Sequence, residues 1–491
     1  MKDLRLRQEN LPLLPKQVAC PSYRRGALSA GIVHIGIGGF HRSHEAFYLN
    51  QLLSTTDETD WAICGVGIRE GDRKMHDILQ RQNGLYTLIT QHPDGKVESE
   101  VIGTIIESLL AIDNPTTVID RMASEDTKIV SLTITEGGYN FDAKGDFNFE
   151  NPDVIHDLAN PDTPKTVFGY LTAALRKRKA EILPPFTLLS CDNIQHNGDV
   201  ARKMLLEFAH RQDPKLALWI AMAMGFPNSM VDRITPVTTD ADIAYLRQNH
   251  QLKDEWPVVC EPFIQWVVED KFTCGRPPLE KVGVQFVPDV TPYEKMKLRL
   301  LNAGHSVLGI LGALHGHNTI NTCMADPVFA KFMRAFMDSE ATPTLDHLDG
   351  IDLKAYKDTL AVRFGNPNIK DSVSRICAYS SAKLPVFIIP TIKENLAAGG
   401  SIKHATLVLA AWCYYHDHQK NENGEPLEII DEAQKALDAA AKGTTSDPLS
   451  FIKLESIFGD LAKDNRFADE YNKAVELVYG DFGVREIMER Y

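Results

Sequence analysis

Short apolar runs alternate with amphipathic patterns through the first half of the chain. Runs rich in β-branched and aliphatic residues, bounded by turn residues, predict buried strands. Four such runs occupy residues 31–36, 61–68, 128–135 and 186–191. The intervening segments have the spacing of helices. Strands that alternate with helices are typical of a parallel sheet covered by helices, so we expect an α/β domain here.

The second part of the chain has a different pattern. After about residue 288 the strand-like runs stop, and helical periodicity continues through segments such as 330–337 and 405–412. A chain of 491 residues is also too long for one ordinary hydrophobic core. We therefore predict two domains, an α/β domain over residues 1–286 and an all-helical domain over residues 287–491.

Composition and charge exclude several classes of partner. Hydrophobic residues make up 44% and charged residues 24% of the chain, which is typical of a globular protein. The formal net charge is −14, from 52 basic and 66 acidic residues, and no basic tract interrupts it. Such a surface repels nucleic acid and anionic membranes, and no apolar stretch is long enough to span a bilayer. A small neutral molecule fits this balance best as the partner.

The cysteines and the N-terminus bear on the compartment. The eight cysteines are spread singly, without any Cys-x-x-Cys pair, which argues against a disulfide framework and against a zinc ribbon. The first ten residues contain no apolar targeting core. We expect a cytoplasmic protein with reduced thiols. We also expect a monomer, because a large helical domain can cover the sheet without a partner subunit.

The first predicted strand runs into a glycine-rich turn and then a helix. The turn reads Gly36-Ile37-Gly38-Gly39-Phe40. Glycines let a backbone approach phosphate oxygens, and a helix N-terminus offers unpaired amides to a pyrophosphate. The third glycine of the usual dinucleotide fingerprint is missing, so an ordinary strand-to-helix turn is an equal alternative for this motif alone. If this turn binds a dinucleotide, the first domain has a Rossmann-type fold.

Acidic residues after the second predicted strand indicate which dinucleotide binds. A carboxylate from Glu70 or Asp72 can hydrogen-bond the adenosine ribose and would repel a 2′-phosphate, which favours NAD. The residues do not decide between the two acids, and helix capping or a solvated turn is the alternative for both. Arg69 and Arg73 leave room for weak NADP use.

Two histidines follow the glycine turn. His41 and His44 lie three residues apart, but no third ligand follows in a recognisable metal-binding register. We therefore expect packing or a hydrogen bond near the cofactor rather than a metal site.

A helix at the start of the second domain has the strongest chemical pattern. Thr291, Pro292 and Glu294 have the pattern of an N-cap, a first-turn proline and a capping box. On a regular α-helix Lys297, Asn302 and His305 lie at relative angles of about 0°, 140° and 80°, which places them on one side.

These three side chains match the needs of alcohol oxidation without a metal. The reaction requires a base for the hydroxyl proton and donors for the developing alkoxide. The helix N-terminus and burial disfavour the ammonium form of Lys297, which makes it the candidate general base. Each residue also has an alternative role. Lys297 could pair with Glu294 at the surface, Asn302 could join two helices, and His305 could be a core histidine.

The chain resembles the polyol-specific long-chain dehydrogenases over nearly its whole length. The matching segments are Gly36–Arg42, Thr135–Tyr139, Ser190–Asn193, Pro227–Pro236 and Lys297–His305. The resemblance implies a Rossmann-type N-terminal domain, an all-helical C-terminal domain, NAD as cofactor and no metal. It also implies interconversion of a polyol and its ketose, with mannitol and fructose as the first expected pair.

The resemblance assigns roles to individual residues. Lys297 is the base, Asn193 and Asn302 polarise the reacting oxygen, and His305 orients the substrate. The implied contacts to the polyol chain are Asp232, Arg375 and Lys383. From the residues alone, Arg375 is a surface charge beside Asp371. The implied cofactor contacts are Gly36, Ile37, Gly38, Gly39, Phe40, Asp72 and Glu136.

Other functions fit less well. Tyr293 and Lys297 form the Tyr-x-x-x-Lys pair of short-chain dehydrogenases, but Pro292 makes this a helix start, and the pair lies more than about 250 residues after the glycine turn. A zinc alcohol dehydrogenase needs cysteine and histidine clusters that we do not find. Arabinitol dehydrogenases and uronate reductases share the Lys/Asn/His core and stay open. A nucleotide-sensing protein without activity would be expected to have lost Lys297 or Asn302.

Overall fold

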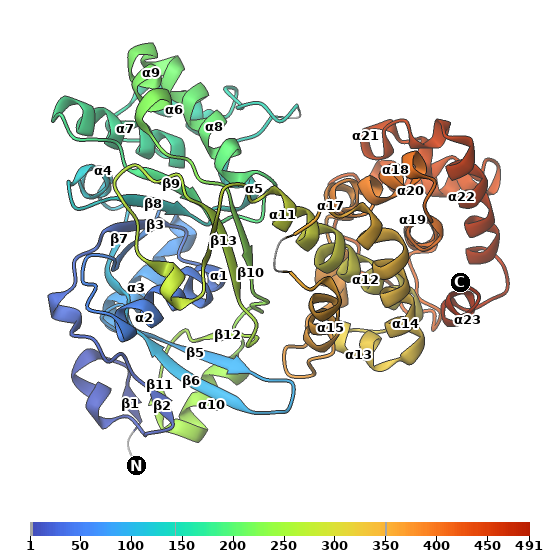
Figure 1. Ribbon diagram of the computed structural model, residues 1–491, viewed down its shortest axis with the longest axis horizontal. Helices are drawn as coiled ribbons and strands as arrows, with labels where there is room; N and C mark the ends of the chain where they lie inside the picture. The colour runs from blue at the N-terminus through green and yellow to red at the C-terminus, as the bar shows by residue number, and fades with distance from the viewer. Residues whose placement is uncertain (1–2, 143, 349–350) are drawn as a thin grey trace. The chain divides into compact units, whose positions relative to one another are not determined.

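The computed structural model describes residues 3–142, 144–348 and 351–491. The chain divides into two compact units, Met1–Thr291 and Pro292–Tyr491 (Figure 1). Each unit has its own hydrophobic core. We describe each unit separately.

The first unit is built on a five-stranded parallel sheet with the strand order β7-β4-β3-β8-β9. The strands are β3 (Ile32–Ile35), β4 (Ile63–Gly67), β7 (Ile105–Leu110), β8 (Ile129–Leu132) and β9 (Thr187–Ser190). The four predicted strand segments correspond to β3, β4, β8 and β9. The third segment ends earlier than its apolar run, because Thr135–Gly138 turns into the short helix α5.

Alternate residues of these strands enter two different cores. Val33, Val130 and Leu188 pack with α4 (Pro115–Ala123), α7 (Val167–Ala180) and α8 (Asn197–Gln212). Ile32, Ile129 and Leu189 pack with α2 (Glu45–Thr55). In Figure 1, α2 (blue) and α7 and α8 (green) lie on different sides of the sheet. Because both faces are covered, most residues of these strands are apolar, as is typical of parallel strands.

Three smaller sheets complete the first unit. One has the order β12-β5-β6-β2, one has the order β10-β13-β14, and β1 pairs with β11. Their bounds are β1 (Leu4–Arg5), β2 (Val18–Ala19), β5 (Tyr86–Gln91), β6 (Val97–Ile102), β10 (Ser229–Asp232), β11 (Leu252–Lys253), β12 (Val258–Cys260), β13 (Gln265–Glu269) and β14 (Gln285–Val287). The pairing of β14 with β13 keeps the chain in the first unit through residue 287.

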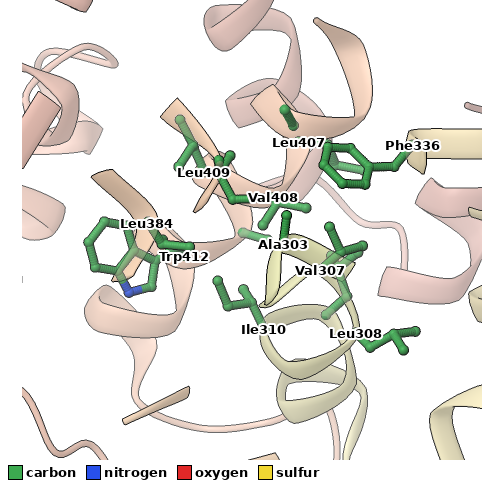
Figure 2. Close-up of a cluster of buried hydrophobic side chains, with 14 of the residues drawn as sticks. Ala303, Val307, Leu308, Ile310, Phe336, Leu384, Leu407, Val408, Leu409 and Trp412 are labelled. Carbon is green, nitrogen blue, oxygen red and sulfur yellow. The ribbon is translucent and has the colours of Figure 1, made fainter. Parts of the chain in front are cut away.

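The second unit is helical and is organised around α12 (Ala303–His315), almost every residue of which is buried. Figure 2 shows Ala303 and Val307 of α12 beside Val408 of α19 (Lys403–His418), within a cluster that includes Trp412. This confirms the prediction of an α/β domain followed by a helical domain. In the described part of the chain, no helix has the length and apolar character needed to cross a membrane.

Candidate active site

The glycine turn follows β3 and requires a glycine at its first position. Gly36 has a φ of +99°, and a Cβ atom there would lie 2.1 Å from the backbone oxygen of Thr133. Its N–H donates to the Val66 oxygen, so the turn is fixed to β4 as well as to β8. Only glycine fits this combination of positive φ and close backbone approach.

The second glycine has no such internal reason. Gly38 has φ −89° and ψ −176°, which any residue adopts, and it precedes α1 (Gly39–Ser43). Beyond the adjacent residues, the atom nearest to a Cβ at Gly38 would be the Gly36 oxygen, 3.9 Å away. The backbone of Gly38 therefore borders open space at a helix N-terminus. A phosphate group can occupy such a space and accept hydrogen bonds from the helix amides.

The side chains between and after these glycines pack onto the first unit. The Ile37 side chain covers Gly65, where a Cβ would lie 2.5 Å from Ile37 Cδ1. Phe40 stacks on His44, with ring centroids 4.9 Å apart. Gly39 sits in ordinary contact distance of Thr235, whose Cγ2 would be 3.6 Å from a Cβ. The side chains of Ile37 and Phe40 thus anchor the turn to the rest of the first unit.

His41 and His44 have different partners. His44 Nε2 lies 2.9 Å from the Gln265 oxygen, and His41 Nδ1 lies 3.2 Å from Glu45 Oε2. Both rings are buried, and burial lowers the pKa of His41 to about 3 and that of His44 to about 4. The two histidines pack and form hydrogen bonds with protein groups.

The acids after β4 have separate roles in the structure. Asp72 Oδ2 accepts hydrogen bonds from the N–H groups of Ile68 and Arg69, at 2.8 and 2.9 Å, and so fixes the end of β4. Glu70 is exposed and pairs with Arg73 at 2.7 Å. Capping therefore accounts for one oxygen of Asp72, and a solvated ion pair accounts for Glu70. Ribose binding by Asp72 stays a prediction.

Asp192 connects the ends of β8 and β9. Its carboxylate accepts hydrogen bonds from the N–H groups of Ile134 and Thr135 and from the Tyr139 hydroxyl. Burial raises its pKa, and these hydrogen bonds oppose that effect. The link places the predicted residues Glu136 and Asn193 at the carboxyl ends of adjacent strands, where open α/β sheets bind ligands. Sequence reasoning named the segment containing Asp192 but gave the residue itself no role.

Asp232 ends strand β10 and is buried, with 4% of its surface exposed. The next residue, Arg233, is also buried and donates to the oxygens of Glu261 and Ser43. Its guanidinium lies over the Phe47 ring. Because Ser43 belongs to α1, Arg233 ties the end of β10 to the helix that follows the glycine turn.

The prediction of a regular α-helix through the catalytic segment is wrong. The segment comprises α11 (Thr291–Lys297), a π-helical turn over Leu298–Asn302, and then α12. A π turn holds about 4.4 residues, so Lys297 and Asn302, five apart, lie at roughly 50° instead of 140° around the axis. The wider turn brings the two side chains closer together than a regular helix would. Single π turns of this kind occur frequently at functional sites.

The polar side chains of this segment are buried. Lys297 is 7% exposed, which excludes the alternative of a surface lysine, and Glu294 is 5% exposed. Asn302 Oδ1 is buried without a hydrogen-bond partner among the described residues. His305 is buried against Phe364, with ring centroids 4.1 Å apart. Buried polar atoms rarely remain unpaired, so the Asn302 amide is a candidate ligand contact.

An arginine missed by sequence reasoning holds the π turn. Arg299 donates to the hydroxyls of Thr344 and Thr391, both at 3.1 Å, and to Glu394 at 2.7 Å. Lys295, four residues earlier, pairs with Glu394 at 3.3 Å. The two cations fix one side of the segment. Their spacing of four was the available signal, since residues four apart share one face of a helix.

The two predicted cations of the second unit lie close to one another. Arg375 lies in α16 (Val373–Cys377), is half exposed, and forms a bidentate pair with Asp371 at 2.6 to 2.8 Å. Lys383 Nζ, from α17 (Ser380–Phe387), lies 3.1 Å from the Ile376 oxygen. α16 packs directly on α12, where Gly309 leaves room for Ile376. Arg375 and Lys383 are thus grouped beside the helix that carries His305.

Comparison with known proteins covers the whole chain. Residues 30–281 match the mannitol dehydrogenase Rossmann domain, and residues 289–479 match the mannitol dehydrogenase C-terminal domain. A mannitol 2-dehydrogenase of Phaeosphaeria nodorum is 45% identical over 99% of this chain and 86% of its own length. One of Aspergillus fumigatus is 44% identical over the full length of both chains.

Solved structures agree with the sequence matches. The Pseudomonas fluorescens mannitol 2-dehydrogenase, in a ternary complex with NAD and D-mannitol, is 44% identical and superposes with a TM-score of 0.89 over 99% of both chains. A D-sorbitol dehydrogenase in substrate-free form is 36% identical, with a TM-score of 0.91 over 99% of this chain and 100% of its own. The protein therefore belongs to the mannitol dehydrogenase family, with its Rossmann and C-terminal domains.

Proposed function

We propose that this protein is an NAD-dependent oxidoreductase that interconverts D-mannitol and D-fructose, with Lys297 as the general base. The proposal rests above all on one observation: a buried lysine directly precedes a π turn that ends at an asparagine whose buried oxygen has no hydrogen-bond partner among the described residues. Membership of the mannitol dehydrogenase family supports the substrate and the cofactor.

The glycine turn fits a dinucleotide. Gly36 needs its glycine for the fold, whereas the open space beside Gly38 at a helix N-terminus suits the pyrophosphate. Asp72 is the proposed ribose contact, because its second carboxylate oxygen remains beside the carboxyl end of β4. Glu136 is a proposed contact at the next loop. A dinucleotide held by these residues would supply the hydride acceptor for oxidation of the carbinol carbon.

The chain's own residues handle the proton. The Lys297 amine accepts the substrate hydroxyl proton at Nζ during oxidation and returns it during reduction. Asn302 and Asn193 donate amide N–H groups to the oxygen on which negative charge develops. Rotation of the Asn302 side-chain amide by about 180° exchanges its oxygen and nitrogen, and so places Nδ2 at the buried position that Oδ1 now occupies. His305, held by Phe364, orients the substrate. An amine base and amide donors supply this chemistry without a metal.

The cations favour a neutral polyol over a uronate. A uronate carboxylate needs a cation whose charge is available, but the Arg375 guanidinium is already engaged by both oxygens of Asp371. In that arrangement Arg375 and Lys383 can hydrogen-bond hydroxyl groups, with Asp232 accepting from others. We therefore place mannitol before the uronates and before arabinitol.

The test is NADH oxidation with fructose by the native protein, Lys297→Ala and the matched control Lys295→Ala. Lys295 is on the same helix but pairs with Glu394. We expect Lys297→Ala to lose about 10²- to 10⁴-fold in turnover, with partial recovery on adding a primary amine, and Lys295→Ala to stay near native. Near-native turnover of Lys297→Ala would refute the base assignment. Activity with another ketose or a uronate, but not fructose, would refute the substrate. Loss of activity with a chelator would refute the metal-free chemistry.

A further inference from the structure

A buried polar cluster lies directly beneath the glycine turn. His34 of β3 and His41 of α1 are stacked, with ring centroids 3.4 Å apart, and both face the Glu45 carboxylate at the start of α2. Each of the three side chains is almost fully buried. The mechanism proposed above uses none of them. A buried carboxylate destabilises the fold unless it is paired, so its retention here requires an explanation.

The hydrogen bonds identify the protonation state of His34. The Thr133 hydroxyl lies 2.6 Å from the Gly36 carbonyl oxygen, which can only accept, so the hydroxyl proton is used there. His34 Nε2, 2.9 Å from the same hydroxyl oxygen, must therefore be the donor. The Ser131 hydroxyl donates to Glu45 Oε2, so His34 Nδ1, at 2.8 Å from Ser131 and 3.0 Å from Glu45, donates too. With both nitrogens protonated, His34 is an imidazolium and has no lone pair for a metal.

The neighbouring groups are consistent with an ion pair. Although burial raises the pKa of Glu45, the hydrogen bonds from His34 and His41 outweigh it and lower that pKa. Burial, together with the charge of His34, lowers the pKa of His41 to about 3, so His41 is neutral. The other titratable groups that act on this cluster include Arg42 and His44 of the same segment, and Cys191 and Asp192 at the end of β9. The positive group of the ion pair is His34, which contacts the Gly36 carbonyl oxygen of the glycine turn.

We propose that the His34–Glu45 ion pair is a positioning device for the dinucleotide: His34, through the Thr133 hydroxyl and the Gly36 carbonyl, holds the glycine turn in the conformation that binds NAD. Two hydrogen bonds carry the link, from Thr133 to Gly36 at 2.6 Å and from His34 to Gly36 at 3.2 Å. This inference rests on the proposed use of NAD. His34, Thr133 and Glu45 are positioning residues that act through the turn.

The test measures NADH affinity and kinetics for Thr133→Val and the matched control Thr172→Val. Thr172 is fully buried in α7, and its hydroxyl has no partner in the described residues. We expect Thr133→Val to raise the dissociation constant and the KM for NADH about fivefold to tenfold with kcat at saturating NADH unchanged, because one hydrogen bond to the turn is lost. Thr172→Val should bind NADH like the native protein.

Glu45→Gln adds a readout that a merely structural role would not change. The substitution removes the negative charge that faces His34 Nδ1 at 3.0 Å, so we expect a higher dissociation constant and KM for NADH in this variant, with kcat at saturating NADH unchanged. Native affinity in Thr133→Val, or equal weakening in Thr172→Val, would overturn the inference while leaving the proposed function intact. A native protein that binds no NADH would overturn both.

Discussion

The Tyr139 hydroxyl donates a 2.9 Å hydrogen bond to Oδ2 of Asp192, and so joins α5 to the end of β9 one residue before Asn193. In Tyr139→Phe the buried carboxylate loses one of its donors. We expect a loss of about 1 to 3 kcal/mol in the free energy of unfolding and a lower kcat, because Asn193 is less firmly placed. Urea titration and steady-state kinetics measure both effects. The control is Tyr170→Phe, since the Tyr170 hydroxyl makes a long hydrogen bond of 3.4 Å to the Ala111 oxygen. Equal effects in the two variants would contradict the assignment.

Gly38→Ala separates cofactor binding from folding. The backbone angles suit alanine, and the nearest atom beyond the adjacent residues is 3.9 Å from the new Cβ, so the melting temperature should stay within a few degrees of native. The methyl group enters the space proposed for the pyrophosphate, and the NADH dissociation constant should rise at least about tenfold. Fluorescence titration with NADH gives the answer. Gly36→Ala should instead destabilise the fold itself, since its Cβ meets the Thr133 oxygen at 2.1 Å. If Gly38→Ala bound NADH with native affinity, the pyrophosphate would not bind at this turn.

Asp72→Asn and Glu70→Gln decide which acid faces the ribose. In Asp72→Asn the side-chain amide oxygen can still accept from Ile68 and Arg69, so the fold is retained while the negative charge is lost. We expect weaker NADH binding and improved NADPH binding in this variant, because the repulsion of a 2′-phosphate is removed. Glu70→Gln, at an exposed ion pair, should change little. Affinities for both nucleotides test this, and the reverse pattern would assign the ribose to Glu70.

Gly309→Ala tests the contact that places Arg375. A Cβ on Gly309 would lie 2.7 Å from Ile376 Cγ2, on the buried face between α12 and α16. Overpacking costs about 1 to 3 kcal/mol, which outweighs the gain of about 1 kcal/mol in helix propensity. The shift of α16 should also raise the KM for the polyol. The double variant Gly309→Ala/Ile376→Ala should be more stable than the sum of the single changes predicts. Simple additivity of the two changes in unfolding free energy would show that the contact does not carry the effect.

The first unit should lose stability in mild acid. His41 and His44 have pKa values of about 3 and about 4, against 6.5 when unfolded, so the folded state keeps them neutral while the unfolded state takes up protons. Their contribution to the free energy of unfolding is fully present above about pH 6.5. As the pH falls below this value, the free energy of unfolding decreases by up to about 2.7 kcal/mol per pH unit where both histidines titrate. Urea titrations at several pH values, followed by tryptophan fluorescence, measure the slope. His44→Asn should reduce the slope by about half, and an unchanged slope would refute the assignment.

Much of the fold follows from patterns that are local in sequence. The central strands β3, β4, β8 and β9 are buried on both faces, so each is a predominantly apolar run that sequence alone reveals. The edge strand β7 and the small sheets were not predicted, because strands such as β6, with the sequence Val-Glu-Ser-Glu-Val-Ile, carry polar residues and lack such a run. The helical second unit was predicted from its periodicity.

The site was predictable where one helix carries it, and less so where distant segments meet. Lys297, Asn302 and His305 share a segment, although the π turn between them changes their spacing around the axis. The pairing of Arg375 with Asp371 could be anticipated from the sequence, because the two residues are four positions apart. By contrast, His34 meets Ser131 across 97 residues, and Ser131 meets Glu45 across 86, so neither contact leaves a local pattern. Only the folded sheet brings these side chains together.

The π turn also lets this segment hold one residue more than a regular helix without separating its polar side chains. A helix that contains one residue more than regular hydrogen bonding accommodates can return to the α form by losing that residue. Deleting a single leucine between Lys297 and Asn302 would change the angle between the base and Asn302 by only about 10°, because four α residues turn the chain by about 400° and the five residues of the π turn by about 410°. A homologue with a one-residue gap at this point could therefore lack the π turn and still present the lysine, the asparagine and the histidine on the same side of the helix.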